Sequence, residues 1–343
     1  MKFSSALPLL LGLAFFAGAG RAESINGHSY VSLAGWARAN GFAGFTLNHG
    51  EEIVLTNKTS RLIFETDSVE SQIHGLKVRL SFPVAKGGFI SQLDADKTLR
   101  PLLFAPKPSA QKITTICLDP GHGGKDTGNR VGRFFPRCEK NYTLALALEL
   151  RQQLKQAGFN VILTREKDVY PELPVRPDIA NRNGADLFVS LHFNSFPGDI
   201  ASVQGAETYC ITPVGAASSN DSEGAAAGSR ASAANRVEDK SLLLAYQVQR
   251  SLVRSGVTDR GVRRARFEVL RSAQMPAILV EGGYMSHPLE GKKIFDAGYR
   301  KQMAAAILRG ILAYQKLVAP PQPPTPKANP ASTNKVSSEK RTK

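Results

Sequence analysis

Apolar and polar positions follow two different patterns along the chain. Between residues 23 and 108, short runs that alternate or are wholly apolar are separated by Asn-Lys, Asp-Ser and His-Gly pairs, as in strands joined by turns. This pattern predicts strands at 27–33, 53–55, 60–65 and 76–82, and helical spacing predicts a helix at 33–40. The segment is long enough for a small core, so we expect a small α+β accessory domain.

From residue 109 to 317 the pattern alternates between strand and helix. Predicted strands cover 113–118, 159–164, 187–191, 207–212 and 277–280, and predicted helices cover 141–157, 176–183, 242–255 and 299–316. Such alternation indicates one α/β domain with a mostly parallel central sheet flanked by helices. In these sheets the functional site lies beyond the carboxyl ends of the strands.

The two ends of the chain have compositions of their own. Lys2 is followed by an apolar run at 6–19 and by small residues ending at Ala22, which predicts a signal peptide over 1–22, with an uncut membrane anchor as the alternative. Pro106-Lys-Pro108 marks a linker, and residues 318–343 predict a disordered, basic, Pro-rich tail. We therefore expect an exported protein of the periplasm, cell wall or extracellular space, without stable membrane insertion.

The net charge bears on the binding partners of the protein, and the cysteine content bears on its disulfides. The formal net charge is +15 and the pI is about 9.8, which favours polyanionic surroundings. No nucleic-acid recognition motif is present in the sequence, so anionic cell-envelope polymers are the better match, although general solubility explains the charge equally well. Cys117, Cys138 and Cys210 allow at most one disulfide. We expect Cys117 and Cys210 to be buried, and Cys138 is an alternative metal ligand beside Glu139.

Four short segments carry the candidate chemistry. They supply His122 within Asp119-Pro-Gly-His-Gly-Gly, Glu139 at the start of a predicted helix, His192 after one predicted strand and Glu281 after another. Two imidazoles, one carboxylate and an open position make a catalytic zinc site, and a further glutamate can serve as its base. Asp119 either orients His122 or caps its loop. Taken alone, the glycine-rich segment also fits a tight turn or a phosphate-cradling loop.

The region from about Thr115 to Gln315 resembles the zinc-dependent N-acetylmuramoyl-L-alanine amidases of the cell-separation type. The shared signature reads Leu118-Asp-Pro-Gly-His-Gly-Gly-Lys-Asp126-Thr-Gly128, Glu139-Lys140, Thr164-Arg165, Arg176, Ala180-Asn181, Ala185-Asp-Leu-Phe-Val-Ser-Leu-His-Phe-Asn194, Arg260-Gly-Val, Val269-Leu270-Arg271 and Met275-Pro-Ala-Ile-Leu-Val-Glu281-Gly-Gly. The resemblance implies that His122, Glu139 and His192 bind one Zn²⁺ and that Glu281 is the catalytic acid/base.

The reaction implied by the resemblance is hydrolysis of the amide between N-acetylmuramic acid and L-alanine in peptidoglycan, by a zinc-activated water, for cell-wall remodelling or daughter-cell separation. The alternatives are a zinc peptidase acting within the stem peptide and a non-catalytic wall-binding protein. The resemblance also suggests a protein activator as a partner. For the accessory domain, binding to the wall or docking is the hypothesis.

Three features of the region depart from the family pattern or lie beside the site. His287 stands where the family often has an amide side chain, and we expect it to cap a helix or hold a loop, with an extra metal ligand as the alternative. Arg176 and Asn194 are expected to hold the loop and helix beside the site, with contact to the substrate as the alternative. The stretch Pro213–Asp239 is rich in Ala, Ser and Gly, which predicts a mobile loop over an accessible or weakly gated site rather than an inhibitory helix.

Overall fold

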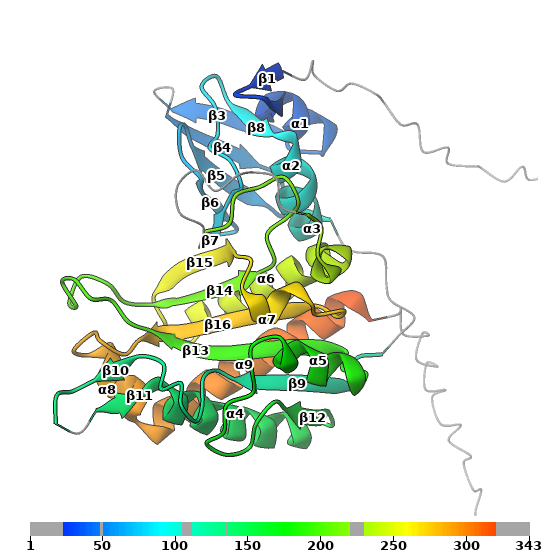
Figure 1. Cartoon of the computed structure of the whole chain (residues 1–343). Helices are drawn as coiled ribbons and strands as arrows, with labels where there is room; N and C mark the ends of the chain where they lie inside the picture. Colours follow the sequence, from blue (N-terminus) through cyan, green and yellow to red (C-terminus); the bar gives the residue numbers. More distant parts are fainter. Residues whose placement is uncertain (1–22, 49–50, 105–111, 135, 220–229, 320–343) are drawn as a thin grey trace, which may run out of the picture.

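The computed structural model describes residues 23–48, 51–104, 112–134, 136–219 and 230–319 (Figure 1). The predicted signal peptide, the linker at 106–108 and the predicted tail from residue 320 lie outside the described residues. The predicted domain boundaries therefore stay predictions. In the part of the chain that is described, no helix has the length and apolar character needed to cross a membrane.

The N-terminal unit is a small sheet flanked by short helices. Its strands are β1 (Glu23–Ile25), β2 (His28–Ser32), β3 (Gly44–Asn48), β4 (Glu52–Thr56), β5 (Arg61–Glu65), β6 (Glu70–Ile73), β7 (Leu76–Arg79) and β8 (Phe89–Ser91). Its helices are α1 (Leu33–Ala39), α2 (Gln92–Asp94), a π-helical turn (Ala95–Leu99) and α3 (Arg100–Leu103). In β4 to β7 the buried and more exposed positions alternate, so one face of these strands packs into the core and the other faces outward.

The larger unit alternates strands and helices. Its strands are β9 (Thr115–Pro120), β10 (Arg130–Val131), β11 (Arg137–Cys138), β12 (Asn160–Leu163), β13 (Leu187–Asn194), β14 (Ala206–Cys210), β15 (Asp259–Arg264) and β16 (Ala277–Tyr284). Its helices are α4 (Glu139–Gln156), α5 (Val175–Arg182), a 3-10 turn (Ala233–Val237), α6 (Glu238–Arg254), α7 (Glu268–Arg271), α8 (Glu290–Phe295) and α9 (Ala297–Val318). The predicted mixed α/β fold with a large central sheet flanked by helices, preceded by a small sheet unit, is confirmed.

The two units share one sheet. Its 11 strands run in the order β12-β9-β13-β16-β14-β15-β7-β6-β5-β4-β3. From β12 to β15 neighbouring strands are parallel, except that β14 runs antiparallel to β16. The junction is the parallel pairing of β15 with β7, where Val262 is the partner of Val78. Beyond it the N-terminal strands are antiparallel.

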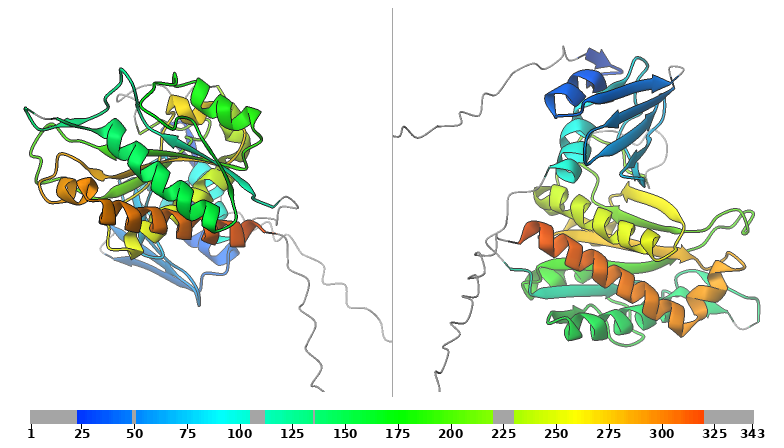
Figure 2. Two further views of the ribbon diagram at one scale, coloured as in Figure 1. Left: turned by 90° about the horizontal axis from the view of Figure 1, so that it is seen from below. Right: turned by 180° about the vertical axis from the view of Figure 1, so that it is seen from behind.

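The two faces of this sheet have different cover. Helices α4, α6 and α9 lie along one face, as Figure 2 shows from behind, and the core between them and the sheet continues into the N-terminal unit through Phe64, Ile73 and Val78. On the opposite face the shorter helices α5 and α7 cover a second apolar cluster that includes Phe188 and Leu279. The metal-ligand candidates lie at the edge of this second face.

Candidate metal centre

The sheet and one helix bring the four predicted site residues together. His122 follows β9, and Glu139 is the first residue of α4. His192 and Glu281 were expected just after their strands, and this was wrong, because β13 continues to Asn194 and β16 to Tyr284. They are direct partners in the parallel pairing of β13 with β16, so both side chains emerge on the same face.

Three of these side chains converge on one point. His122 Nε2 lies 3.0 Å from Glu139 Oε2, and His192 Nδ1 lies 3.1 Å from Glu139 Oε1. The two ring nitrogens are 3.2 Å apart. One donor atom from each residue lies within 4.8 Å of the others, so the group could hold a metal ion. Two imidazoles and a carboxylate are a donor set that suits zinc in hydrolytic sites.

Hydrogen bonds fix the carboxylate of Glu139, which is 1% exposed. The backbone N–H of Phe193 donates to Oε1 at 3.0 Å, and the backbone N–H and side-chain amide of Asn129 donate to Oε2, each at 3.0 Å. Burial by itself would raise the pKa of Glu139, but hydrogen bonds and charge interactions with the two histidines outweigh it and lower this pKa. Glu139 is therefore ionised at neutral pH.

The ring of His122 is oriented by a residue other than the one proposed from sequence. Asp126 Oδ2 lies 2.8 Å from His122 Nδ1, which turns Nε2 towards Glu139. Burial lowers the pKa of His122, but the contacts with Glu139 and then Asp126 outweigh it and raise the pKa. Orientation of His122 by Asp119 was wrong: Asp119 accepts hydrogen bonds from Thr164, Ser190 and Arg176 instead.

Two glycines make room for the close packing of the group. A Cβ on Gly121 would lie 2.3 Å from Cε1 of His192. A Cβ on Gly128 would lie 2.6 Å from both Glu139 Oε2 and His122 Cδ2, and Gly128 has a φ of +60°. Any larger side chain at either site would displace a candidate ligand.

Arg176 holds the loop beside the site, as expected, whereas Asn194 lies in β13 and bonds a residue of β14. Arg176 donates to the carbonyl of His122 at 2.9 Å, which fixes the loop after β9. Asn194 donates to Glu207 Oε1 at 2.9 Å. Glu207 is the partner of Glu281 in the antiparallel pairing of β14 with β16, so the sheet aligns His192, Glu281 and Glu207 across three strands.

Glu281 is the unusual member of the site. Its Oε2 atom is buried and has no hydrogen-bond partner among the described residues. Burial, followed by the negative charges of Glu139 and Glu207, raises the pKa of Glu281 well above its ordinary value. A raised pKa makes the ionised carboxylate a stronger base, which suits it to accept a proton from water.

Glu281 and the three grouped residues line one cavity of about 330 Å³. Its lining consists of His122, Gly128, Asn129, Glu139, Leu173, His192, Phe267, Glu268, Val269, Leu279 and Glu281. Of the segment Pro213–Asp239, residues 220–229 lie outside the described part, and none of the described ones lines this cavity. The expectation of an accessible or weakly gated site stays a prediction.

His287 and the cysteines lie apart from the grouped ligands. His287 Nδ1 accepts hydrogen bonds from the backbone N–H groups of Leu289 and Glu290 at the start of α8, so the predicted capping role is confirmed. All three cysteines are free, and Cys117 and Cys210 are buried as expected. The thiol of Cys138 contacts the carbonyl of Pro136 at 3.7 Å, and among the described residues the ligand group comprises the two histidines and Glu139.

Sequence reasoning did not assign Asn129, Asp126 or Glu207. Asp126 belonged to the quoted signature and comes four residues after His122, a spacing that could have indicated a partner. Glu207 stands in a predicted strand among apolar residues, and a carboxylate at such a position is a signal for a buried, paired charge.

Comparisons with known proteins point to one family. The family model for N-acetylmuramoyl-L-alanine amidase matches residues 116–313. The N-acetylmuramoyl-L-alanine amidase AmiA of Escherichia coli (strain K12) is 31% identical over 252 residues, which are 66% of this chain and 86% of that protein. The uncharacterized protein YqiI of Bacillus subtilis (strain 168) is 34% identical over 218 residues, covering 63% of this chain and 91% of that protein. The crystal structure of an N-acetylmuramoyl-L-alanine amidase from Clostridium difficile 630 matches with a TM-score of 0.50 and 34% identity, over 60% of this chain and 98% of that one.

Proposed function

The chain belongs to the N-acetylmuramoyl-L-alanine amidase family, and we propose that His122, Glu139 and His192 hold a single zinc ion for this activity. The enzyme hydrolyses the amide bond between N-acetylmuramic acid and L-alanine in peptidoglycan. Its substrate is therefore the cell wall, and we further propose that the apolar run at 6–19 exports it to the wall. The protein activator suggested by the resemblance stays a prediction.

The donor set fits zinc, and the cavity leaves one side of the group open to a ligand. When bound, a zinc ion polarises a carbonyl oxygen and makes water a stronger acid. Asp126 holds His122 with Nε2 facing the group, and Asn129 with the backbone of Phe193 holds both oxygens of Glu139. These contacts preorganise the ligands before any ion arrives.

Glu281 carries the proton. Its carboxylate accepts the proton of the attacking water and, in its protonated form, donates it to the nitrogen of the departing L-alanine as the carbon–nitrogen bond breaks. The single observation that supports this role is the buried Oε2, which has no hydrogen-bond partner among the described residues and belongs to a side chain lining the cavity of the ligand group. The raised pKa of Glu281 lets it hold the proton between the two steps.

Product analysis tests the proposal. Purified sacculi are digested with and without a chelator, and the fragments are identified by mass spectrometry. Free stem peptides that begin with alanine, released only when metal is present, support the amidase. Shortened stems would instead indicate a zinc peptidase, and no release would indicate a wall-binding protein.

Two variants separate the proposed roles within the cavity. Glu281→Gln is expected to abolish release while the zinc content, measured by elemental analysis, stays at one ion per chain. Glu268→Gln is the matched control, because Glu268 lines the same cavity but is paired with Arg271 at 3.2 Å. Retained activity in Glu281→Gln, or equal losses in both variants, would refute the assignment of the proton carrier.

A further inference from the structure

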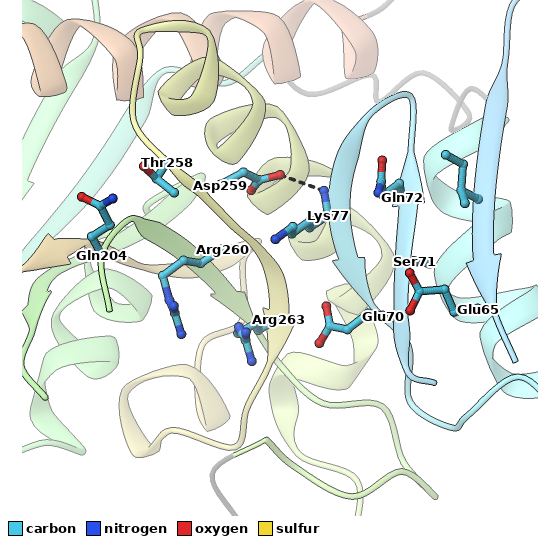
Figure 3. Close-up of a pocket in the computed structure, with 11 residues that line it drawn as sticks. Glu65, Glu70, Ser71, Gln72, Lys77, Gln204, Thr258, Asp259, Arg260 and Arg263 are labelled. Atoms are coloured by element: carbon cyan, nitrogen blue, oxygen red, sulfur yellow. Dashed lines mark hydrogen bonds between the residues drawn. The ribbon is translucent and has the colours of Figure 1, made fainter. Parts of the chain in front are cut away.

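A second cavity, of about 420 Å³, lies where the N-terminal strands meet the larger unit. Figure 3 shows that Arg260 and Arg263 line one side of it, while Glu65 and Glu70 line the other, with Lys77 between them. The backbone N–H of Lys77 donates to Asp259 at 2.8 Å, which ties β7 to β15 across the floor. The strands that line the two sides of the cavity are therefore joined to each other.

This junction cavity and the metal centre lie on the same face of the one sheet. Glu281 is the partner of Glu207 across β16 and β14, and Tyr209, two residues further along β14, is the partner of Arg263 on β15. Side chains two residues apart on a strand share a face, so Arg263 emerges on the same side as Glu207 and Glu281. Arg263 is therefore the charged side chain that follows Glu281 and Glu207 across this face of the sheet.

Glu207 anchors the two arginines. Its side chain is 4% exposed, and Oε2 lies 2.8 Å from Nε of Arg263 and 3.3 Å from Nε of Arg260. Its other oxygen accepts hydrogen bonds from Asn194 and Tyr209. One carboxylate thus faces two guanidinium groups, so these three side chains together carry one positive charge.

The outer ends of both guanidinium groups are available to a ligand. Within the described residues, their terminal nitrogens have no hydrogen-bond or ion-pair partner, and the side chains of Arg260 and Arg263 are 28% and 21% exposed. Arg260 also lies over the ring of Tyr284, with Cζ 5.0 Å from the ring centre, which limits its movement. Two oriented guanidinium forks with unused donors are the arrangement that binds a carboxylate.

We propose that Arg260 and Arg263 bind a carboxylate of the stem peptide whose bond to muramic acid is cleaved, and this rests on the amidase function proposed above. The ligand class is a short peptide that carries a carboxylate close to its amino-terminal alanine. Glu65 and Glu70 across the cavity disfavour a second carboxylate there, so the cavity accepts one negative charge beside the arginines.

The test compares three substrates in the zinc-loaded, full-length enzyme: N-acetylmuramoyl-L-alanyl-D-glutamic acid and its two monoamides. One of the amides is expected to lower kcat/KM by about 10- to 100-fold relative to the diacid, because it removes the charge-assisted pair. In Arg263→Gln this ratio is expected to fall below about 3-fold, while Arg260 still neutralises Glu207. In the double variant Glu207→Gln/Arg263→Gln the charge of Arg260 is no longer neutralised, so this variant is expected to recover part of the preference that Arg263→Gln alone has lost.

Arg151→Gln is the matched control, because Arg151 also forms an ion pair, with Glu166 at 3.0 Å, and neither residue lines the junction cavity. It is expected to keep the wild-type ratio. An unchanged ratio in Arg263→Gln, or a wild-type enzyme indifferent to both amides, would overturn the carboxylate site and leave the amidase function intact. Calorimetric titration of L-alanyl-D-glutamate and its amides measures the same preference without turnover. If the titration shows a preference that Arg263→Gln abolishes, this result supports the carboxylate site even when no substrate is cleaved. Absence of cleavage would instead refute the amidase function.

Discussion

Replacing Arg176 by methionine should destabilise the protein strongly, because this buried cation joins four acceptors beneath the metal centre. The side chain is 1% exposed. It donates to Asp119 Oδ1 at 2.8 Å and to the carbonyl groups of Pro120, His122 and Pro171 at 3.0, 2.9 and 3.1 Å. Methionine keeps much of the apolar length but supplies no donor, so Arg176→Met removes the charge without opening a large cavity.

The magnitude follows from what remains around Asp119. Removing one partner of a buried ion pair costs about 3–5 kcal/mol, because the other charge is left uncompensated. Thr164 and Ser190 still donate to Asp119 at 2.6 and 2.7 Å in the variant, so its carboxylate keeps two hydrogen bonds. We therefore expect a loss near the lower end, about 3 kcal/mol in the free energy of unfolding.

Urea unfolding followed by circular dichroism measures this loss. Arg151→Met is the matched control, since Arg151 pairs with Glu166 at 3.0 Å on the surface, where the carboxylate is 67% exposed. That variant should lose less than about 1 kcal/mol. The double variant Asp119→Asn/Arg176→Met should be more stable than Arg176→Met alone, because no buried charge is left unpaired. Equal losses in Arg176→Met and Arg151→Met would refute the reasoning, as would a double variant less stable than the single one.

Three further changes probe the metal centre and its surroundings. Asp126→Asn is expected to weaken zinc affinity by about 10- to 100-fold, measured by competition with a chelator, because His122 loses the partner that fixes its ring; an affinity within 2-fold of wild type would count against it. Gly121→Ala should remove stoichiometric zinc, since its Cβ would overlap the ring of His192, and a fully loaded variant would contradict this. His287→Ala should cost about 1 kcal/mol in unfolding free energy through the lost cap of α8 and leave zinc content unchanged; a loss of zinc would show that His287 is a ligand after all.

The fold class was predictable because the buried strands are apolar runs and the helices show helical spacing of their apolar residues. Strands such as β9 and β13 are apolar on both faces, so the sequence predicts them at nearly the right positions. β15 was missed because its sequence is Asp-Arg-Gly-Val-Arg-Arg, with a single apolar residue. Arg260 and Arg263 pair with Glu207 and line the junction cavity, so charged residues stand where a strand pattern would show apolar ones.

The site was predictable in residue type but only partly in its contacts. Histidine and glutamate are residue types that bind zinc, so the sequence by itself offers the two histidines and Glu139 as candidate ligands. The partner of His122 cannot be read in the same way, because Asp119 and Asp126 are both close in sequence. The turn after β9 decides between them. Asp119 lies within β9 and is buried, whereas Asp126 lies beyond the turn with its carboxylate beside the imidazole ring of His122. Such a choice depends on the path of the backbone through the glycines, which the sequence does not specify.

The pairing of β15 with β7 has a consequence for dividing this protein. A fragment that begins near residue 112 would leave β15 as an uncovered edge, with its hydrogen-bonding groups free to pair with another copy of the sheet. The same cut would uncover Tyr246 on α6, whose hydroxyl donates to the carbonyl of Ile73 at 2.9 Å. We expect such a fragment to self-associate in solution, so the N-terminal strands also act as a protective edge for the catalytic sheet.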